Sequence, residues 1–342
     1  MILVINAGSS SIKFKLFEFE SLKMVYEGII QEITDHHRGF EQLQEILKSK
    51  NIDFSHIKAI GHRVVHGGER FSRPTVIDED VIDAIKSLIP LAPLHNSANL
   101  EGIYAAKRLA AQITNIAVFD TAFHQSMPEY AYRYPLPNEM YNSLHVRKYG
   151  FHGTSHQYVS NKAAKLLDID INRVNLITLH IGNGVSACAI KGGKSVDTSM
   201  GMTPLEGLMM GTRSGSIDPA IIAYLIREAG YSIDEVDTIL NKKSGLLAIA
   251  GESDMRKLLS SDDRYSKLAI EMFTYRLKRY IGEYMAVLGR VDAVVFTGGI
   301  GENSAKIREL TCKGLENFNL KTVVIKTDEE LQIALHVKDI LR

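Results

Sequence analysis

Short apolar runs rich in β-branched residues alternate with amphipathic helical patterns along most of the 342 residues. Such alternation is typical of an α/β fold, in which helices cover the faces of a sheet. The runs with the length of buried strands span residues 2–5, 12–19, 116–119, 175–180, 185–190 and 291–296. Residues 78–89, 265–288 and 328–341 have helical periodicity. We expect Asp78 and Ser97 to cap the helices that follow them.

One pattern occurs twice in the chain. Residues 3–14 and 177–188 align when Gly8 is placed on Gly182, and each has the pattern of a strand, a glycine-containing turn and a second strand. One pair of hairpins is a weak repeat signal, because β-turns share their preferred residues. The pattern nevertheless suggests two related halves that face each other across a cleft, with one loop from each pointing inward.

Composition argues against several classes of protein. The 40 basic and 40 acidic residues cancel, so no overall basic field would attract nucleic acid. No apolar run approaches the ~18 residues of a membrane span, and the N-terminal residues lack the basic start of a signal peptide. Cys188 and Cys312 have no CxxC spacing, which favours a reducing compartment. We therefore expect a soluble cytoplasmic protein with no nucleic-acid or membrane partner.

Two glycine-containing segments are suited to binding phosphate. Residues 6–13 (NAGSSSIK) combine a glycine, three hydroxyls and Lys13, although a serine-rich turn has the same composition. Residues 297–303 (TGGIGEN) follow a strand and precede a helical pattern, which directs backbone N–H groups toward an anion. Neither segment has the spacing of a Walker loop or a dinucleotide fingerprint. A mononucleotide is the better prediction, with residues 182–184 (GNG) as the matching phosphate loop.

Histidines and arginines are the other candidates for chemistry. The i,i+4 pairs His62/His66 and His152/His156 lack the glutamate of HExxH and have no cysteine partners, so a zinc site is not predicted. We expect most histidines to be hydrogen-bonded structural residues. Arg63 lies in a stretch that ends in Gly67 and Gly68, and Arg213 is flanked by glycines, a setting that fits bidentate capture of an anion. A surface salt bridge is the alternative for either arginine.

Taken together, these segments and several others resemble the acetate kinase family. The matching stretches are NAGSSSIK (residues 6–13), GHRVVHGGE (61–69), APLHN (92–96), VFDTAFHQ (118–125), YGFHGTSH (149–156), HIGNG (180–184), DTSMGMTPLEGLMMGTRSG (197–215), SGLL (244–247), FTGGIGENS (296–304) and TDEEL (327–331). They occur in the family's order along essentially the whole chain. The resemblance implies the α/β fold shared by sugar kinases, Hsp70 and actin, with two related domains and ATP in the cleft between them. It places one domain at residues 1–149, with 330–342 packing back on it, and a nucleotide-binding domain at 150–329.

The resemblance also implies roles for individual residues. Asp120, His152 and Arg213 would form the catalytic group, and Arg63 would bind the acyl substrate. Asn6 and Glu329 would support Mg²⁺, or Mn²⁺ in its place. The methyl pocket would be walled by Val65, Leu94, Phe151 and Pro204. ATP would contact Lys13, His180, Ile181, Gly182, Asn183, Gly184, Asp254, Met255, Arg256, Gly299, Ile300, Gly301, Glu302 and Asn303.

The implied activity is reversible phosphoryl transfer from ATP to acetate, giving acetyl phosphate and ADP. Acetate is already ionised at neutral pH, so we interpret Asp120 as an orienting partner for an arginine or a Mg²⁺-bound water. A propionate or butyrate kinase is the alternative within the family, because one methylene changes binding by only about 1–3 kcal/mol. A non-catalytic ATP-binding regulatory or chaperone-like protein is the alternative from another class. The set of Arg63, His152 and Arg213 argues against that class.

The chain departs from the family pattern in length and at two positions. It is shorter, with apparent deletions after the second strand and between residues 309 and 323. Met255 stands where an aromatic residue is common, and Ser216 where an aspartate is common. The resemblance also implies a homodimer. An interface on residues 265–288 is predicted because their apolar side chains exceed what one internal face needs: Ile270, Phe273, Leu277, Ile281, Tyr284 and Leu288.

Overall fold

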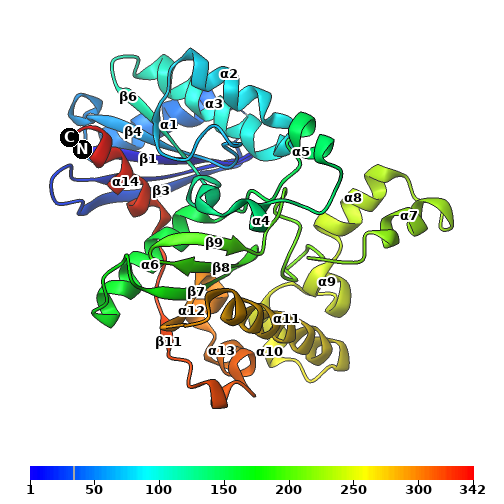
Figure 1. The fold of residues 1–342 in the computed structure, drawn as a ribbon. Helices are drawn as coiled ribbons and strands as arrows, with labels where there is room; N and C mark the ends of the chain where they lie inside the picture. The colour runs from blue at the N-terminus through cyan, green and yellow to red at the C-terminus, as the bar shows by residue number, and fades with distance from the viewer. Residues whose placement is uncertain (34) are drawn as a thin grey trace. The chain divides into compact units, whose positions relative to one another are not determined.

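The computed structural model describes residues 1–33 and 35–342, which form two units of helices and strands (Figure 1). Unit 1 consists of Met1–Gln125, Gly153–Ser155 and Asp328–Arg342, and unit 2 of Ser126–His152 and His156–Thr327. The domain boundaries expected from the sequence stay predictions. Within the described residues, no helix combines the length and the apolar character needed to cross a bilayer.

Unit 1 contains a six-stranded mixed sheet in the order β3-β2-β1-β4-β6-β5. Its strands are β1 (Ile2–Ala7), β2 (Ser11–Phe17), β3 (Met24–Gln31), β4 (Ala59–Val64), β5 (Thr75–Val76) and β6 (Thr114–Phe119). β1 and β2 form an antiparallel hairpin, closed by a 2.8 Å hydrogen bond from the N–H of Gly8 to the carbonyl of Ser11. β1, β4 and β6 run parallel, so the residues that follow them lie at one edge of the sheet.

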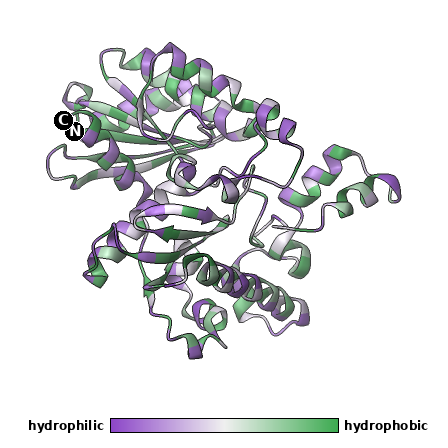
Figure 2. Cartoon of the chain, viewed as in Figure 1, coloured by the Kyte–Doolittle hydropathy of each residue, from purple (hydrophilic) through white to green (hydrophobic). Residues whose placement is uncertain are grey.

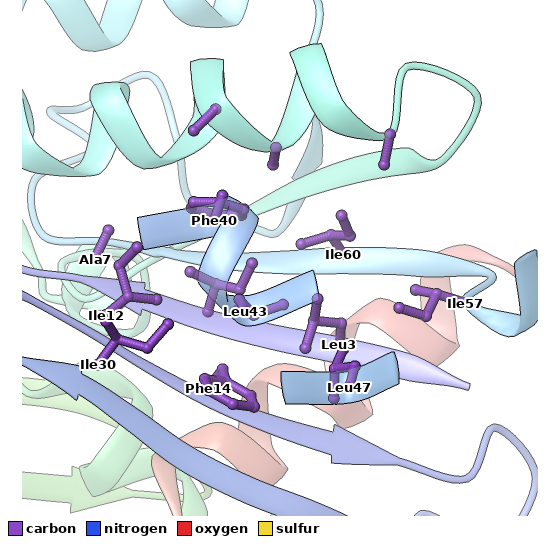
Figure 3. Packing of buried hydrophobic residues seen from close by; sticks show 14 of the residues in the cluster. Leu3, Ala7, Ile12, Phe14, Ile30, Phe40, Leu43, Leu47, Ile57 and Ile60 are labelled. Carbon is purple, nitrogen blue, oxygen red and sulfur yellow. The ribbon is translucent and has the colours of Figure 1, made fainter. Parts of the chain in front are cut away.

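Helices cover both faces of this sheet because alternate residues of β1 point to opposite sides. The helices of unit 1 are α1 (His36–Ser49), α2 (Glu79–Ser87), α3 (Pro93–Leu109) and α14 (Glu329–Ile340). Leu3 packs in one core cluster with Leu43 of α1, as Figure 3 shows. Val4, the next residue, packs in another cluster with Val337 of α14. This packing fixes α14 against the sheet, and with it Glu329, the first residue of the helix.

Unit 2 repeats the topology of unit 1. Its sheet has the order β11-β10-β7-β8-β9, with β7 (Asn175–Ile181), β8 (Val185–Lys191), β9 (Lys194–Thr198), β10 (Ala293–Thr297) and β11 (Thr322–Val324). β7 pairs antiparallel with β8 and parallel with β10, just as β1 pairs antiparallel with β2 and parallel with β4. The repeat predicted from residues 3–14 and 177–188 is therefore confirmed. Figure 2 shows β8 as mostly hydrophobic, in keeping with its burial, and the neighbouring β9 as more hydrophilic.

Unit 2 contains most of the remaining helices, of which α11 is the longest and buries one face in the core. The remaining helices are α4 (Glu129–Tyr132), α5 (Asn138–Leu144), α6 (Gly153–Leu167), α7 (Ala220–Arg227), α8 (Ile233–Lys242), α9 (Gly245–Ala250), α10 (Met255–Ser260), α11 (Arg264–Leu288), α12 (Gly298–Asn303) and α13 (Ala305–Cys312). Short 3₁₀ helices span Phe54–His56, Ile89–Leu91, Ala122–Ser126 and Glu316–Phe318. The interface predicted on the apolar stripe of α11 is wrong, because the stripe lies in the core: Ile270, Phe273, Leu277, Ile281, Tyr284 and Leu288 are all buried.

One of the two helix caps predicted from the sequence is confirmed, and the other is wrong. Asp78 caps α2, as predicted, by accepting a 2.9 Å hydrogen bond from the N–H of Val81. Asp328 likewise caps α14. The prediction that Ser97 caps a helix is wrong, because α3 begins four residues earlier at Pro93. Proline is favoured at the first position of a helix, because an N–H there would have no partner within the helix and the φ of proline is already helical. The helix therefore begins at Pro93.

His62 of β4 makes the stability of the protein sensitive to acid. Its Nε2 donates a 2.7 Å hydrogen bond to Oδ1 of Asn115, and burial lowers the pKa of His62 from 6.5 to about 4. As the pH falls from 6.5, the unfolded chain binds a proton that the folded chain does not, so the free energy of unfolding decreases. We expect a loss of about 3 kcal/mol from this group by pH 4.

Urea unfolding of the wild type and of His62→Gln across this pH range measures the effect. The glutamine variant cannot take up the proton, so its stability is expected to fall less steeply with acid than that of the wild type. Identical pH slopes for the two proteins would contradict the assignment to His62.

Candidate functional site

Arg63 and Asp120 meet at the edge of the unit 1 sheet where β4 and β6 end. Nε of Arg63 donates to Oδ1 of Asp120 at 3.0 Å, and Nη2 donates to Oδ2 at 2.5 Å. Glu329, the first residue of α14, lies with Oε2 3.9 Å from Nε of Arg63. Three residues that are distant in sequence are thus brought together because two parallel strands and one helix end at the same place.

The charged groups of this cluster shift one another's pKa values. Burial alone lowers the pKa of Arg63, but Asp120 and Glu329 outweigh it and raise that pKa, so the guanidinium stays cationic. Burial raises the pKa of Glu329 to about 7, with Arg63 opposing and Asp120 adding to the shift. Two carboxylates thus share one guanidinium, and a further cation beside Glu329 would favour its charged form. The alternative of a surface salt bridge does not describe Arg63, because Asp120 is buried.

The loop that follows β4 is fixed from α3. The N–H of Val65 donates to Oδ1 of Asn99, and the N–H of His66 donates to Oδ1 of Asn96, each at 3.0 Å. Sequence reasoning assigned no role to Asn96 or Asn99. The sequence shows only two asparagines three residues apart on one helix. That pattern predicts a role in fixing the loop only if α3 is already known to face it. Val65 is buried, and the side chain of Leu94 lies outside the part of the structure described.

The hairpin of β1 and β2 carries two further predicted residues. Asn6 and Lys13 lie opposite each other in the register of the two strands. Lys13 is close enough to Glu329 for its charge to lower the pKa of that carboxyl. Asn6, Lys13 and Glu329, predicted for the metal and the phosphates, therefore all belong to unit 1, together with Arg63 and Asp120.

His152 and Arg213 form a second cluster, in unit 2, around the turn between β7 and β8. The rings of His152 and His180 stack with centroids 4.2 Å apart. A Cβ on Gly184 would lie 3.3 Å from Cε1 of His152 and 3.7 Å from Nη1 of Arg213, so both side chains border this glycine. The turn itself is closed by a 3.0 Å hydrogen bond from the N–H of Gly182 to the carbonyl of Gly184.

Arg213 differs from Arg63 in its partners. Its Nη1 donates to the carbonyl of Pro204 at 3.1 Å, and no carboxylate lies within 4 Å of its guanidinium among the residues that the structure describes. Burial lowers the pKa of Arg213 but leaves an arginine fully charged at neutral pH. A half-buried cation without a carboxylate beside a glycine turn is suited to an anionic ligand. Pro204 contacts Arg213 through its backbone, and Phe151 is buried.

A cavity of about 640 Å³ lies next to this turn, within unit 2. This volume is in the usual range for small-molecule sites. Its lining consists of Gly182, Asn183, Ser253, Asp254, Met255, Arg256, Leu259, Gly299, Ile300, Asn303 and Ser304. Eight of the residues predicted for the nucleotide are thus brought to one cavity from three separate segments.

Some predicted residues do not line the cavity. His180 and Gly184 belong to the neighbouring cluster, while Ile181 is buried in β7 and Gly301 packs near it. The side chain of Glu302 makes hydrogen bonds within the protein. Its Oε1 accepts from the N–H groups of Gly298 and Thr327, each at 3.0 Å.

Sequence reasoning missed three residues of the cavity lining. Leu259 lies one helical turn after Met255 on α10, so helical spacing would have found it. Ser253 and Ser304 are next in sequence to predicted residues and have no separate signal. Asp254 pairs with Arg256 at 2.6 Å, and that hydrogen bonding lowers the pKa of Asp254 to about 2.

Comparison with solved structures identifies the class of fold. A propionate kinase from Francisella tularensis subsp. tularensis matches with a TM-score of 0.94 at 42% identity, covering 98% of this chain and 98% of that one. The acetate kinase of Porphyromonas gingivalis also matches with a TM-score of 0.94, at 40% identity, covering 100% of this chain and 99% of that one. The duplicated α/β architecture is therefore that of these two small-carboxylate kinases.

Sequence comparison then identifies the family. The family model described as the Acetokinase family matches residues 27–336. An acetate kinase from Sulfurovum sp. (strain NBC37-1) is 52% identical over 340 residues, which cover 92% of this chain and 86% of that one. This chain belongs to the acetokinase family.

Proposed function

We propose that this chain catalyses reversible, Mg²⁺-dependent phosphoryl transfer from ATP to acetate, giving acetyl phosphate and ADP. The observation that carries the proposal is the cluster of His152 and Arg213 at the glycine turn, beside a cavity large enough for a nucleotide. Membership of the acetokinase family supplies the acceptor. The chain is thus proposed to be a phosphotransferase with a carboxyl group as acceptor.

Phosphoryl transfer asks the protein mainly for positioning and charge stabilisation. An oxygen of the acetate carboxylate attacks the γ-phosphorus, and the bond from that phosphorus to the oxygen of ADP breaks. No base is required, because acetate is already ionised. Arg213 and His152 would stabilise the charge on the transferring phosphoryl oxygens. Such electrostatic stabilisation is usually the largest single contribution to the rate enhancement. The cavity lined by Met255 and Asn303 would hold the rest of the nucleotide.

Arg63 is proposed to hold the acetate carboxylate. Asp120 occupies its Nε and Nη2 hydrogens on one side, and within the described residues Nη1 makes no hydrogen bond. The end formed by Nη1 and Nη2 is thus available for a bidentate carboxylate. Asp120 acts here as the orienting partner of Arg63.

The residues of unit 1 fit a divalent cation. Glu329 and Asp120 share one guanidinium, so a further cation beside them would favour the charged form of Glu329. Carboxylate and amide oxygens, such as those of Glu329 and Asn6, are the hard ligands that Mg²⁺ prefers. We propose that Asn6 and Glu329 support Mg²⁺, or Mn²⁺ in its place. When bound, the ion would supply charge neutralisation for the phosphates.

The proposed function is tested with ATP, Mg²⁺ and a short carboxylic acid, trapping any acyl phosphate as its hydroxamate. We expect product with acetate, with a higher kcat/KM than for propionate or butyrate. A higher kcat/KM for propionate would favour the alternative within the family, which the kinase from F. tularensis represents. ATP binding without any acid-dependent product would support the regulatory alternative.

We also propose that the protein is a cytoplasmic homodimer. Neither Cys188 nor Cys312 forms a disulfide within the described chain, which suits a reducing compartment. For the dimer, the supporting feature is α7, an apolar helix (AIIAYLIR) in which no residue is buried. Tyr224 is 63% exposed and Ile221 is 42% exposed. An apolar helix left uncovered within one chain is typical of a surface that another copy covers.

Replacing Tyr224 with glutamate is therefore expected to dissociate the dimer, because the change puts a charge in the middle of the apolar face. Sedimentation velocity should give twice the 38.1 kDa of one chain for the wild type and the mass of one chain for Tyr224→Glu. Tyr130→Glu, at an exposed tyrosine outside α7, is the matched control and should stay dimeric. A wild type that sediments as a single chain would dismiss the dimer.

A further inference from the structure

A continuous line of hydrogen bonds runs from the interior of unit 2 to His152. Oγ1 of Thr178 on β7 lies 2.7 Å from Nδ1 of His156, and Nε2 of His156 lies 2.8 Å from Oγ of Ser186 on β8. That same Oγ lies 2.8 Å from Nδ1 of His152. Thr178, His156 and Ser186 are completely buried, so protein atoms must satisfy their hydrogens.

Only one direction of donation uses every hydroxyl hydrogen in the line. If Thr178 donates to Nδ1 of His156, then Nε2 of His156 donates to Ser186, and Ser186 donates to Nδ1 of His152. In the reverse direction Nδ1 of His156 donates to Thr178, whose own hydrogen then has no acceptor among the described residues. A buried hydroxyl without an acceptor costs about 1–3 kcal/mol, so the first direction is favoured.

The first direction has a consequence for His152. Since Nδ1 accepts from Ser186, the hydrogen of the neutral ring is on Nε2. The edge of the ring that carries Nε2 faces the glycine turn, because a Cβ on Gly184 would lie 3.4 Å from Nε2. Arg213 borders the same glycine. The hydrogen on Nε2 therefore points to the place where the phosphoryl group is proposed to bind.

The backbone at His152 also restricts the ring. His152 has φ +57° at the N-cap of α6, a left-handed conformation that costs a residue other than glycine energy. His180 stacks against the ring on one face. The orientation of the ring is thus set by the backbone and by His180, and the position of its hydrogen is set by Ser186.

We propose that Thr178, His156 and Ser186 are positioning residues that hold His152 in the tautomer with its hydrogen on Nε2. The catalytic consequence rests on the proposed function: a donor that is already aimed at the phosphoryl oxygens needs no reorganisation during transfer. In the other tautomer, a nitrogen lone pair would face those oxygens and repel them. The positioning groups act only through His152.

The tautomer is measured directly by ¹H–¹⁵N NMR of the full chain labelled at the histidine nitrogens. The His152 signals are assigned by their loss in His152→Asn. We expect the hydrogen on Nε2 and an unprotonated Nδ1 in the wild type, and a mixture of tautomers in Ser186→Ala. A hydrogen on Nδ1 of His152 in the wild type would overturn the proposal. This readout does not depend on activity, so it is separate from any failure of the proposed function.

The kinetic test compares two buried threonines on either side of one residue. Thr178 and Thr198 pair with Cys188 from opposite neighbouring strands, and Oγ1 of Thr198 donates to the carbonyl of Ala187 at 3.0 Å. We expect Thr178→Val to lower kcat about 10-fold with KM for ATP changed less than about twofold. Thr198→Val should keep the wild-type kcat at a similar melting temperature, and Thr178→Ser should restore it. Equal kcat values for the two valine variants would overturn the proposal.

Discussion

Replacing Arg213 with alanine is expected to lower kcat by about 10²–10³-fold while KM for ATP changes little. The reason is that no carboxylate neutralises this guanidinium among the described residues, and its Nη1 borders the same glycine as His152. Its charge is thus placed to act on the phosphoryl group during transfer, more than on the bound nucleotide. Steady-state kinetics with ATP and acetate varied in turn measure both constants.

Arg276→Ala is the matched control for that variant. Arg276 is also half-buried in unit 2, and its Nη1 also donates to a backbone carbonyl, that of Ser216, at 3.4 Å. It is not part of either cluster, so we expect near-normal kcat. If Arg213→Ala keeps the kcat of this control, Arg213 is structural and the proposed role in transfer is wrong.

The second large effect is expected for Arg63→Lys, which should raise KM for acetate by about tenfold or more and leave KM for ATP close to wild type. Acetate offers one carboxylate and one methyl group, so its recognition depends on that carboxylate. A lysine keeps the charge but cannot bind Asp120 and a second carboxylate through one planar group. We also expect kcat to fall, because small misplacement of a reacting group can cost about 10²-fold.

Kinetics and the melting temperature of the same variant separate this role from a structural one. If Arg63 only neutralises buried Asp120, the variant will melt at a lower temperature and both KM values will stay as in the wild type. Arg70→Lys, at an exposed position seven residues later, is the control and should change neither quantity. An unchanged KM for acetate would remove Arg63 from the substrate site.

The central strands of both sheets were predictable because they are buried on both faces. β1, β7 and β10 are mostly apolar, and such short apolar runs are visible in a single sequence. β3 was not predicted, since most of its residues are exposed and no alternation of apolar and polar residues marks it. The antiparallel hairpins were found from their glycine turns, whereas the order of strands within a sheet depends on pairings that are distant along the chain.

The candidate site was predictable as a set of residues and not as an arrangement. Asp120 directly follows an apolar run, so its place at the end of a strand could be expected. Its contact with Arg63 could not, because 57 residues separate them and β4 must first pair with β6. Ser186 is a harder case. It lies within an apolar strand, and its role depends on the register that places it beside His180 of β7.

The most direct test of the proposed function follows the phosphorus atom itself. ATP, Mg²⁺ and acetate labelled with ¹⁸O in its carboxylate are mixed with the enzyme, and ³¹P NMR is recorded during the reaction. The account predicts that an acyl phosphate signal grows as the γ-phosphate of ATP disappears, with the isotope shift that an ¹⁸O bridge from acetate to phosphorus produces. Conversion of ATP to unlabelled inorganic phosphate, or no loss of ATP when acetate is present, would contradict it.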